Sequence, residues 1–182
     1  MKHISIILLA TMSIFIQAGQ GIYVCKNANI SLYSKAPIED IEAKSGTGTS
    51  VFNAATGDLA FSVSIRSFQF PKSLMQEHFN ENYMESDKYP QATFKGKISE
   101  HPDVTKDGTY LVTATGDLTV HGVTQARTIP GKIMVSNGVI SMTSEFMVKC
   151  ADHKITIPQL VFHNIAESIR LQIAATYTSY KK

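Results

Sequence analysis

The chain has 182 residues, of which 17 are Lys or Arg and 15 are Asp or Glu. This length is typical of one domain. Charged residues make up only 18% of the chain and the formal net charge is +2, which excludes a disordered chain, a coiled coil and an Arg-rich nucleic-acid binder.

The first residues predict a signal peptide. Lys2 and His3 precede an apolar run, Ile4–Ile16, and small residues follow at Ala18 and Gly19. This order is typical of a secretory signal, and the run is short for a membrane span. We expect residues 1–19 to be the signal peptide and residues 20–182 to form one mature domain, periplasmic or secreted. A retained N-terminal anchor is the alternative.

Apolar and polar residues then alternate along successive segments, as in strands with one buried face and one solvent-exposed face. The alternating segments, together with two less regular ones near the start, are Ile22–Tyr33, Ile38–Ser45, Leu59–Arg66, Ala92–Ser99, Tyr110–His121, Arg127–Val135, Ile140–Lys149 and Ile169–Tyr177. Asn137-Gly138 predicts a type I′ hairpin between two of them. About eight such strands separated by turns indicate a sandwich or a barrel.

One segment, Pro71–Asn80, breaks the alternation and predicts a short helix between strands. Pro71 suits the first helical position. Leu74 and His78, like Met75 and Phe79, are four residues apart and would share a face. A second irregular segment, Pro158–Ala166, is another candidate for a helix.

The two cysteines, Cys25 and Cys150, would lie in an oxidising compartment after export. We expect a disulfide between them, which would stabilise the fold by about 4–5 kcal/mol in the chain-entropy model. Two buried free thiols are the alternative.

No motif indicates an enzyme or a metal site. The mature histidines form no HxH or HExxH pattern, and there is no CxxC. Asp117 with His121, and Cys150 with His153, are candidate catalytic groups. Neither pair shows side chains that converge in the way that catalysis requires. The helix-spaced Glu77, Glu81 and Glu85 could do acid–base work, but a solvated helix face explains them better. We expect no catalytic residue, no metal and no cofactor.

If the strands close into a barrel, the inward side chains either fill the lumen or leave space for one small ligand. Small inward residues, at Ala92, Gly96, Ala114 and Gly116, occur beside large aromatic ones. They could open space for a ligand, or merely make room for their large neighbours, and the sequence leaves both interpretations open.

The stretch from Phe52 to Gly122 resembles the YceI-like family, exported bacterial proteins that bind lipids or polyisoprenoids. The resemblance rests on Lys88-Tyr89-Pro90-Gln91-Ala92-Thr93-Phe94-Lys95-Gly96 and on Gly116-Asp117-Leu118-Thr119-Val120-His121-Gly122-Val123-Thr124. It implies an all-β fold, an antiparallel eight-stranded lipocalin-like barrel with one short helix between strands, whose lumen holds a long isoprenoid or fatty chain. The sequence departs from the family pattern at Tyr23–Ala28, where we expect a shortened opening strand, and at Cys150–Ala166.

We therefore expect a non-enzymatic exported protein that sequesters or transports a polyisoprenoid or a fatty-acid- or fatty-amide-like lipid. It would have no nucleic-acid partner and no stable membrane span after signal removal, while a homodimer is left open. The alternative is a structural or interaction barrel with a packed core. Leu74, Met75 and Phe79 would cover one end, and His78 and Arg66 are candidate partners for a polar head group. By strand parity the remaining expected lining residues are Phe61, Val63, Ile65, Phe68, Phe94, Ile98, Tyr110, Val112, Leu118, Val120, Met142, Phe146 and Val148.

Overall fold

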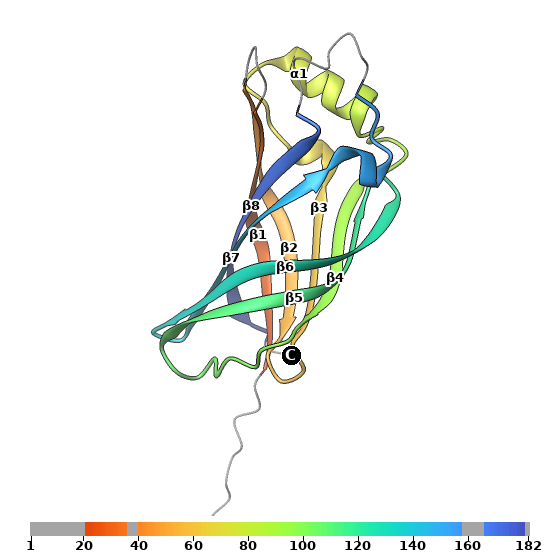
Figure 1. Ribbon diagram of the computed structural model, residues 1–182. Coiled ribbons are helices and arrows are strands. Elements are labelled where there is room, and N and C mark those ends of the chain that lie inside the picture. Colours follow the sequence, from red (N-terminus) through yellow and green to blue (C-terminus); the bar gives the residue numbers. More distant parts are fainter. Residues whose placement is uncertain (1–20, 36–39, 158–165, 181–182) are drawn as a thin grey trace, which may run out of the picture.

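The computed structural model describes residues 21–35, 40–157 and 166–180. Eight strands form one closed antiparallel barrel in which each strand pairs with its sequence neighbours and β8 returns to β1 (Figure 1). The strands are β1 (Ile22–Ser34), β2 (Ile41–Asn53), β3 (Asp58–Ser64), β4 (Gln91–Ile98), β5 (Gly108–Val120), β6 (Val123–Ser136), β7 (Val139–Lys149) and β8 (Ser168–Ser179). The predicted all-β, eight-stranded antiparallel barrel is confirmed.

Two tight turns have the backbone that type I′ hairpins require. Asn137 and Gly138, between β6 and β7, have φ values of 50° and 76°, as the sequence predicts. His121 and Gly122 have φ values of 50° and 69° and join β5 directly to β6. Strand β6 therefore begins at Val123, earlier than the alternation indicated, and the chain reverses at His121.

The opening of the chain differs from its sequence-based interpretation. Strand β1 is 13 residues long and pairs with both β2 and β8, so the expectation of a shortened opening strand is wrong. Its register shifts between Cys25 and Ala28 and again before Ile30, which marks irregular pairing with β2. Irregularities of this kind bend a strand and increase its twist, and this blurs the simple alternation of the segment.

The predicted short helix is present. Helix α1 (Ser73–His78) continues into a single π-helical turn, η2 (Phe79–Tyr83). The helix begins at Ser73, so Pro71 does not occupy its first position. Together with a short helical turn after β3, η1 (Ile65–Ser67), and one after β7, η3 (Cys150–His153), it lies at one end of the barrel (Figure 1). We call this the lid end, and the opposite end, with loop 99–107 and the β6–β7 hairpin, the loop end.

The two cysteines are free and buried, which contradicts the expected disulfide. Val24, beside Cys25, pairs with Thr178 near the end of β8, whereas Lys149, beside Cys150, pairs with Ser168 at its beginning. About ten residues of extended strand correspond to roughly 33 Å, far beyond the roughly 7 Å that a disulfide spans between Cα atoms.

Two expectations concern residues outside the described ones. The signal peptide falls in residues 1–20, and all but the last residue of the candidate helix Pro158–Ala166 is likewise outside the described residues. Within the described part of the chain, no helix is long and apolar enough to cross a membrane.

Candidate functional site: the lumen of the barrel

The barrel encloses an apolar cavity of about 200 Å³. An engineered apolar cavity of about 150 Å³ stays dry and binds benzene, so this space is sufficient for part of an apolar ligand. Its lining comes from every strand except β2 and from the lid end. Besides the residues predicted from the sequence, the inward side chains of the lining include Ile30, Leu32, Leu59, Met84, Ala92, Ala114, Ile129, Ile133, Ile155, Ile169, Leu171, Ile173, Ala175 and Tyr177.

Most residues predicted from strand parity line this cavity. The structure brings together Phe61, Val63, Ile65, Phe68, Phe79, Phe94, Ile98, Val112, Leu118, Val120, Met142, Phe146 and Val148. Leu74, Met75 and Tyr110 are not part of the lining. Leu74 has 59% of its surface exposed on the outer side of α1, so the inward face of the helical segment is formed by residues after it.

An aromatic cluster lies at the lid end and borders the lumen. The ring of Phe79 lies 5.8 Å from that of Phe68 and 4.9 Å from that of Phe70, measured between centroids. Phe79 and the buried Met84 both line the cavity. Aromatic pairs at these distances pack favourably, so the segment after α1 is an apolar cover over the lumen.

Polar contacts fasten this cover to the rest of the barrel. His121, in the β5–β6 turn, places Nε2 2.7 Å from Glu85 Oε2, and its Nδ1 donates to the His153 carbonyl at 3.1 Å. The His121 ring also packs edge-on against Tyr89, with centroids 4.5 Å apart. Three chain segments that are distant in sequence therefore meet at one buried histidine.

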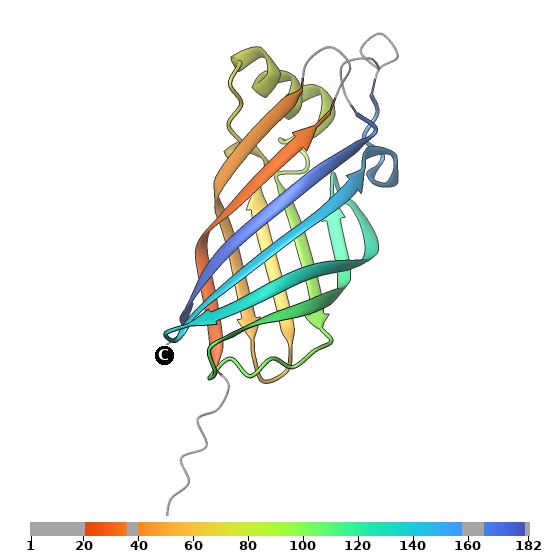
Figure 2. The same cartoon turned by 60° about the vertical axis from the view of Figure 1, so that its left-hand side comes forward.

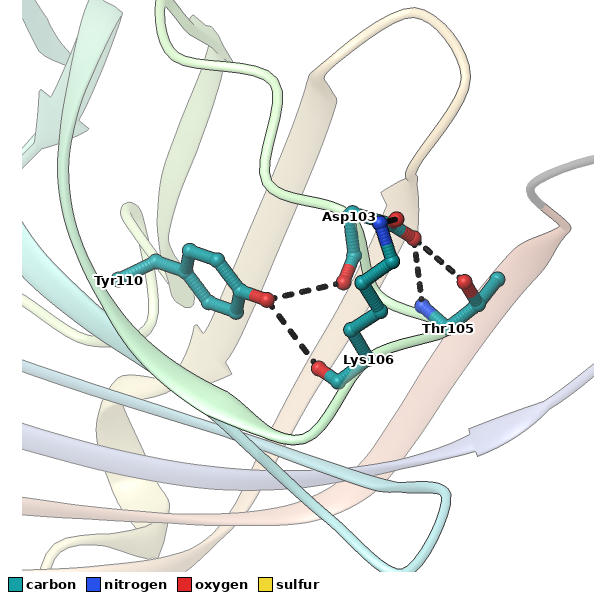
Figure 3. Close-up of polar contacts among 4 residues, drawn as sticks. All are labelled: Asp103, Thr105, Lys106 and Tyr110. Carbon is teal, nitrogen blue, oxygen red and sulfur yellow. Dashed lines mark hydrogen bonds and ion pairs between the residues drawn. The ribbon is translucent and has the colours of Figure 1, made fainter.

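Tyr110 contacts the loop 99–107 at the loop end and does not line the lumen. Its hydroxyl lies 3.2 Å from the carbonyl oxygens of both Asp103 and Lys106 (Figure 3). The Asp103 carboxylate accepts hydrogen bonds from the backbone N–H and the hydroxyl of Thr105, at 3.1 and 2.5 Å, and pairs with Lys106 Nζ at 3.0 Å. The Thr105 hydroxyl, followed by Lys106, lowers the pKa of Asp103 to about 2.

Ser50 and Tyr177 form a buried polar contact in the wall near the loop end. Ser50 Oγ donates to the Ala60 carbonyl at 2.8 Å, so the Tyr177 hydroxyl, 2.7 Å away, donates to Ser50 Oγ. Burial raises the pKa of Tyr177 to about 12. The phenol is thus paired and neutral, and offers no reactive group to the cavity.

The small residues of β4 and β5 have two different roles. Ala92 and Ala114 line the cavity. Gly96 and Gly116 face each other across the β4–β5 pair, where a Cβ on Gly116 would lie 2.3 Å from Gly96 Cα. The two glycines permit close strand approach, and the Phe94 ring covers Gly96. The alanines leave space in the lumen, and the glycines serve packing.

The candidate catalytic groups do not form a site. Asp117 points to the exposed outer face of β5, whereas His121 is buried in the turn. Cys150 lines the cavity, and burial raises the pKa of its thiol. His153 donates from Nδ1 to the Val123 carbonyl at 3.0 Å. Among the described residues, no group of three His, Cys, Asp or Glu could hold a metal ion.

The proposed head-group partners do not reach the lumen either. Arg66 is exposed and forms an ion pair with Asp87, and His78 is exposed on α1. The lining residues missed from the sequence lie mostly on β1, β6 and β8. On β8 the sequence does carry a signal for inward-facing residues, since Ile169, Leu171 and Ile173 alternate with polar residues.

A closed antiparallel barrel with an apolar lumen and an apolar cover is the architecture of a barrel lipid-binding protein. The YceI-like domain model matches residues 29–177, and the chain belongs to this family. No curated protein matches the chain.

Solved structures with the same fold share little sequence with the chain. A polyisoprenoid-binding domain from Saccharophagus degradans, implicated in plant cell wall breakdown, has a TM-score of 0.74 at 12% identity and covers 87% of this chain and 98% of its own. Burkholderia cenocepacia BcnA has a TM-score of 0.71 at 16% identity, covering 83% and 96%. The Campylobacter jejuni YCEI protein has a TM-score of 0.62 at 18% identity, covering 81% and 90%.

Proposed function

We propose that this protein is an exported, non-enzymatic binding protein that holds a long apolar chain, a polyisoprenoid or a fatty-acid- or fatty-amide-like lipid, for sequestration or transport. The observation that carries the proposal is the apolar cavity beneath the cover formed by Phe79 and Met84. Burial of ligand carbon contributes about 25 cal/mol per Å² before the costs of ordering are subtracted.

The chemistry of the lumen favours binding over catalysis. The described residues bring no nucleophile, base and orienting group together, and the buried thiol of Cys150 is held in its protonated form by its raised pKa. The Saccharophagus domain, a polyisoprenoid-binding protein by its description, shares the fold and supports the same ligand class here. Export rests on the signal-peptide pattern of residues 1–19, which predicts a periplasmic or secreted protein.

The test is native mass spectrometry of the mature protein recovered from the periplasm of its own cells, with extraction and identification of any bound lipid. We expect a stoichiometric isoprenoid or fatty chain and an N-terminus created by cleavage near Ala18 or Gly19. An empty protein that also fails to take up added lipids would contradict the proposal and favour a structural or interaction barrel.

A matched pair of variants places the ligand. Ala92 on β4 lines the cavity, and Ala60 on β3 points outward from the neighbouring strand. Ala92→Leu should fill part of the lumen and weaken lipid binding while the fold is retained. Ala60→Leu adds the same atoms to the outer surface and should leave binding unchanged. Equal effects of the two substitutions would place the ligand outside the lumen.

A further inference from the structure

The wall of the barrel is incomplete between β6 and β7. Their ladder runs from Ser136–Val139 at the hairpin only as far as Gly131–Ser144. Beyond it, β6 continues to pair with β5 and β7 continues to pair with β8. The two strands diverge from their hairpin towards the lid end (Figures 1 and 2).

Side chains replace the missing ladder. Arg127 Nη2 donates to the Met147 carbonyl at 2.6 Å, and Ser144 Oγ donates to the Pro130 carbonyl at 2.6 Å. Nearer the lid end, Gln125 Nε2 donates to the Asp152 carbonyl of η3 at 2.8 Å. A guanidinium group fits between the strands at Arg127, so they are too far apart there for direct backbone pairing.

The cavity reaches the outer surface where the ladder ends. Pro130, Lys132 and Thr143 are exposed on the outer face, yet they line the same cavity as the inward Ile133 and Met142. A lumen behind an intact wall is lined mainly by inward residues, because side chains alternate across a strand, whereas here outward residues of two neighbouring strands contribute together. The outward Thr93 of β4 also contributes to the lining, but it is paired on both sides, so the wall is continuous there.

We propose that this opening, on the lid-end side of the last ladder pair Gly131–Ser144 of β6 and β7, is a lateral portal through which an amphiphile enters, and that its anionic end group stays at the portal beside Lys132. The inference rests on the proposed lipid-binding function. It assigns the ligand one apolar chain inside the lumen and one carboxylate or phosphate end in water.

Two observations define this ligand class. The cavity of about 200 Å³ is at or below the lower limit of common ligand pockets, so a long chain extends beyond it through an opening. Lys132 forms no ion pair within the described part of the chain, and it stands at the rim with the Thr143 and Ser144 hydroxyls. The nearby Glu145 accepts a hydrogen bond from Gln172 Nε2 at 2.7 Å, on the β8 side.

The first experiment compares hexadecanoate with hexadecanol, which differ only in the charged end, on the full mature protein and on Lys132→Gln and Lys95→Gln. Lys95 is an exposed lysine on β4, away from the portal. We expect Lys132→Gln to weaken hexadecanoate binding about two- to fivefold, the range of exposed charge pairs, and to leave hexadecanol binding unchanged. Lys95→Gln should change neither.

The second experiment obstructs the opening. Thr143→Cys and Lys95→Cys are labelled with the same bulky maleimide, and the unsubstituted protein measures any reaction of the two buried cysteines. We expect the label at position 143 to slow lipid association several-fold and the label at position 95 to have no effect. If both lipids bind, and neither Lys132→Gln nor the label at position 143 changes their binding or association, the portal is overturned but the proposed function is not. Failure of the unsubstituted protein to take up either lipid would overturn the proposed function and the portal with it.

Discussion

His121 Nε2 lies 2.7 Å from Glu85 Oε2, and this contact joins the β5–β6 turn to the segment that covers the lumen. The other ring nitrogen, Nδ1, already donates to the His153 carbonyl. Both nitrogens of a buried ring are therefore occupied, and the cover is held to two parts of the barrel through one side chain.

Glu85→Ala should destabilise the protein by about 1 kcal/mol, because it leaves a buried ring nitrogen without its partner. Denaturant unfolding measures the loss, and hydrogen exchange should show faster opening of residues 73–90. Glu85→Gln is the control, since its amide can still form a hydrogen bond with His121 Nε2. Equal loss in both variants would show that the contact does not hold the cover.

Gly116→Ala should destabilise the barrel by about 1–3 kcal/mol or more, as overpacking does. The new Cβ would lie 2.3 Å from both Gly96 Cα and the Lys95 carbonyl oxygen, and these are backbone atoms that move only if β4 and β5 separate. Gly46→Ala meets nothing nearer than Asn29 Oδ1 at 3.6 Å. That control should stay within about 0.5 kcal/mol in the same denaturant unfolding measurement.

Tyr177 predicts a loss of stability at high pH. Burial raises its pKa from 10.0 to about 12, so the unfolded chain loses this proton first. The stabilisation that the protonated Tyr177 phenol gives the folded protein is complete below about pH 10 and is lost as pH rises towards 12. Urea unfolding across this range should show a shallower decline for Tyr177→Phe than for the unsubstituted protein. Identical slopes would contradict the burial of the phenol.

Asp103 predicts the opposite behaviour at acid pH. Hydrogen bonds from Thr105, and then Lys106, lower its pKa to about 2. The stabilisation that these contacts give the folded protein is therefore present above the ordinary pKa of 3.8 and is lost as pH falls towards 2. Titration of the carboxyl carbon by nuclear magnetic resonance measures this pKa directly. Thr105→Val removes the hydroxyl donor and should bring the pKa of Asp103 back towards 3.8.

The protein should contain two free thiols even after isolation from an oxidising compartment. A thiol reagent should react slowly with the folded protein and with both cysteines after denaturation, because both side chains are buried. The intact mass under non-reducing conditions should be that of the fully reduced chain. A mass lower by two hydrogen atoms would contradict the separation of Cys25 and Cys150 along β8.

Local sequence determined much of the architecture. Alternation of apolar and polar residues placed the strands and identified Phe61, Val63 and Phe94 as inward-facing, because side-chain direction in a strand follows directly from parity. Asn137-Gly138 fixed its hairpin, since those residues tolerate positive φ. The apolar character of the lumen therefore followed from the sequence without knowledge of strand order.

Tertiary structure decided the features that depend on packing between distant segments. The short helical segment has apolar residues on several sides, and only docking against Phe68 and Phe70 turned Phe79 inward and left Leu74 exposed. The distance between Cys25 and Cys150 depends on the length of β8, which neither residue encodes. The divergence of β6 from β7 depends on each strand keeping its other partner, β5 or β8, because a ladder forms only where two backbones run at pairing distance.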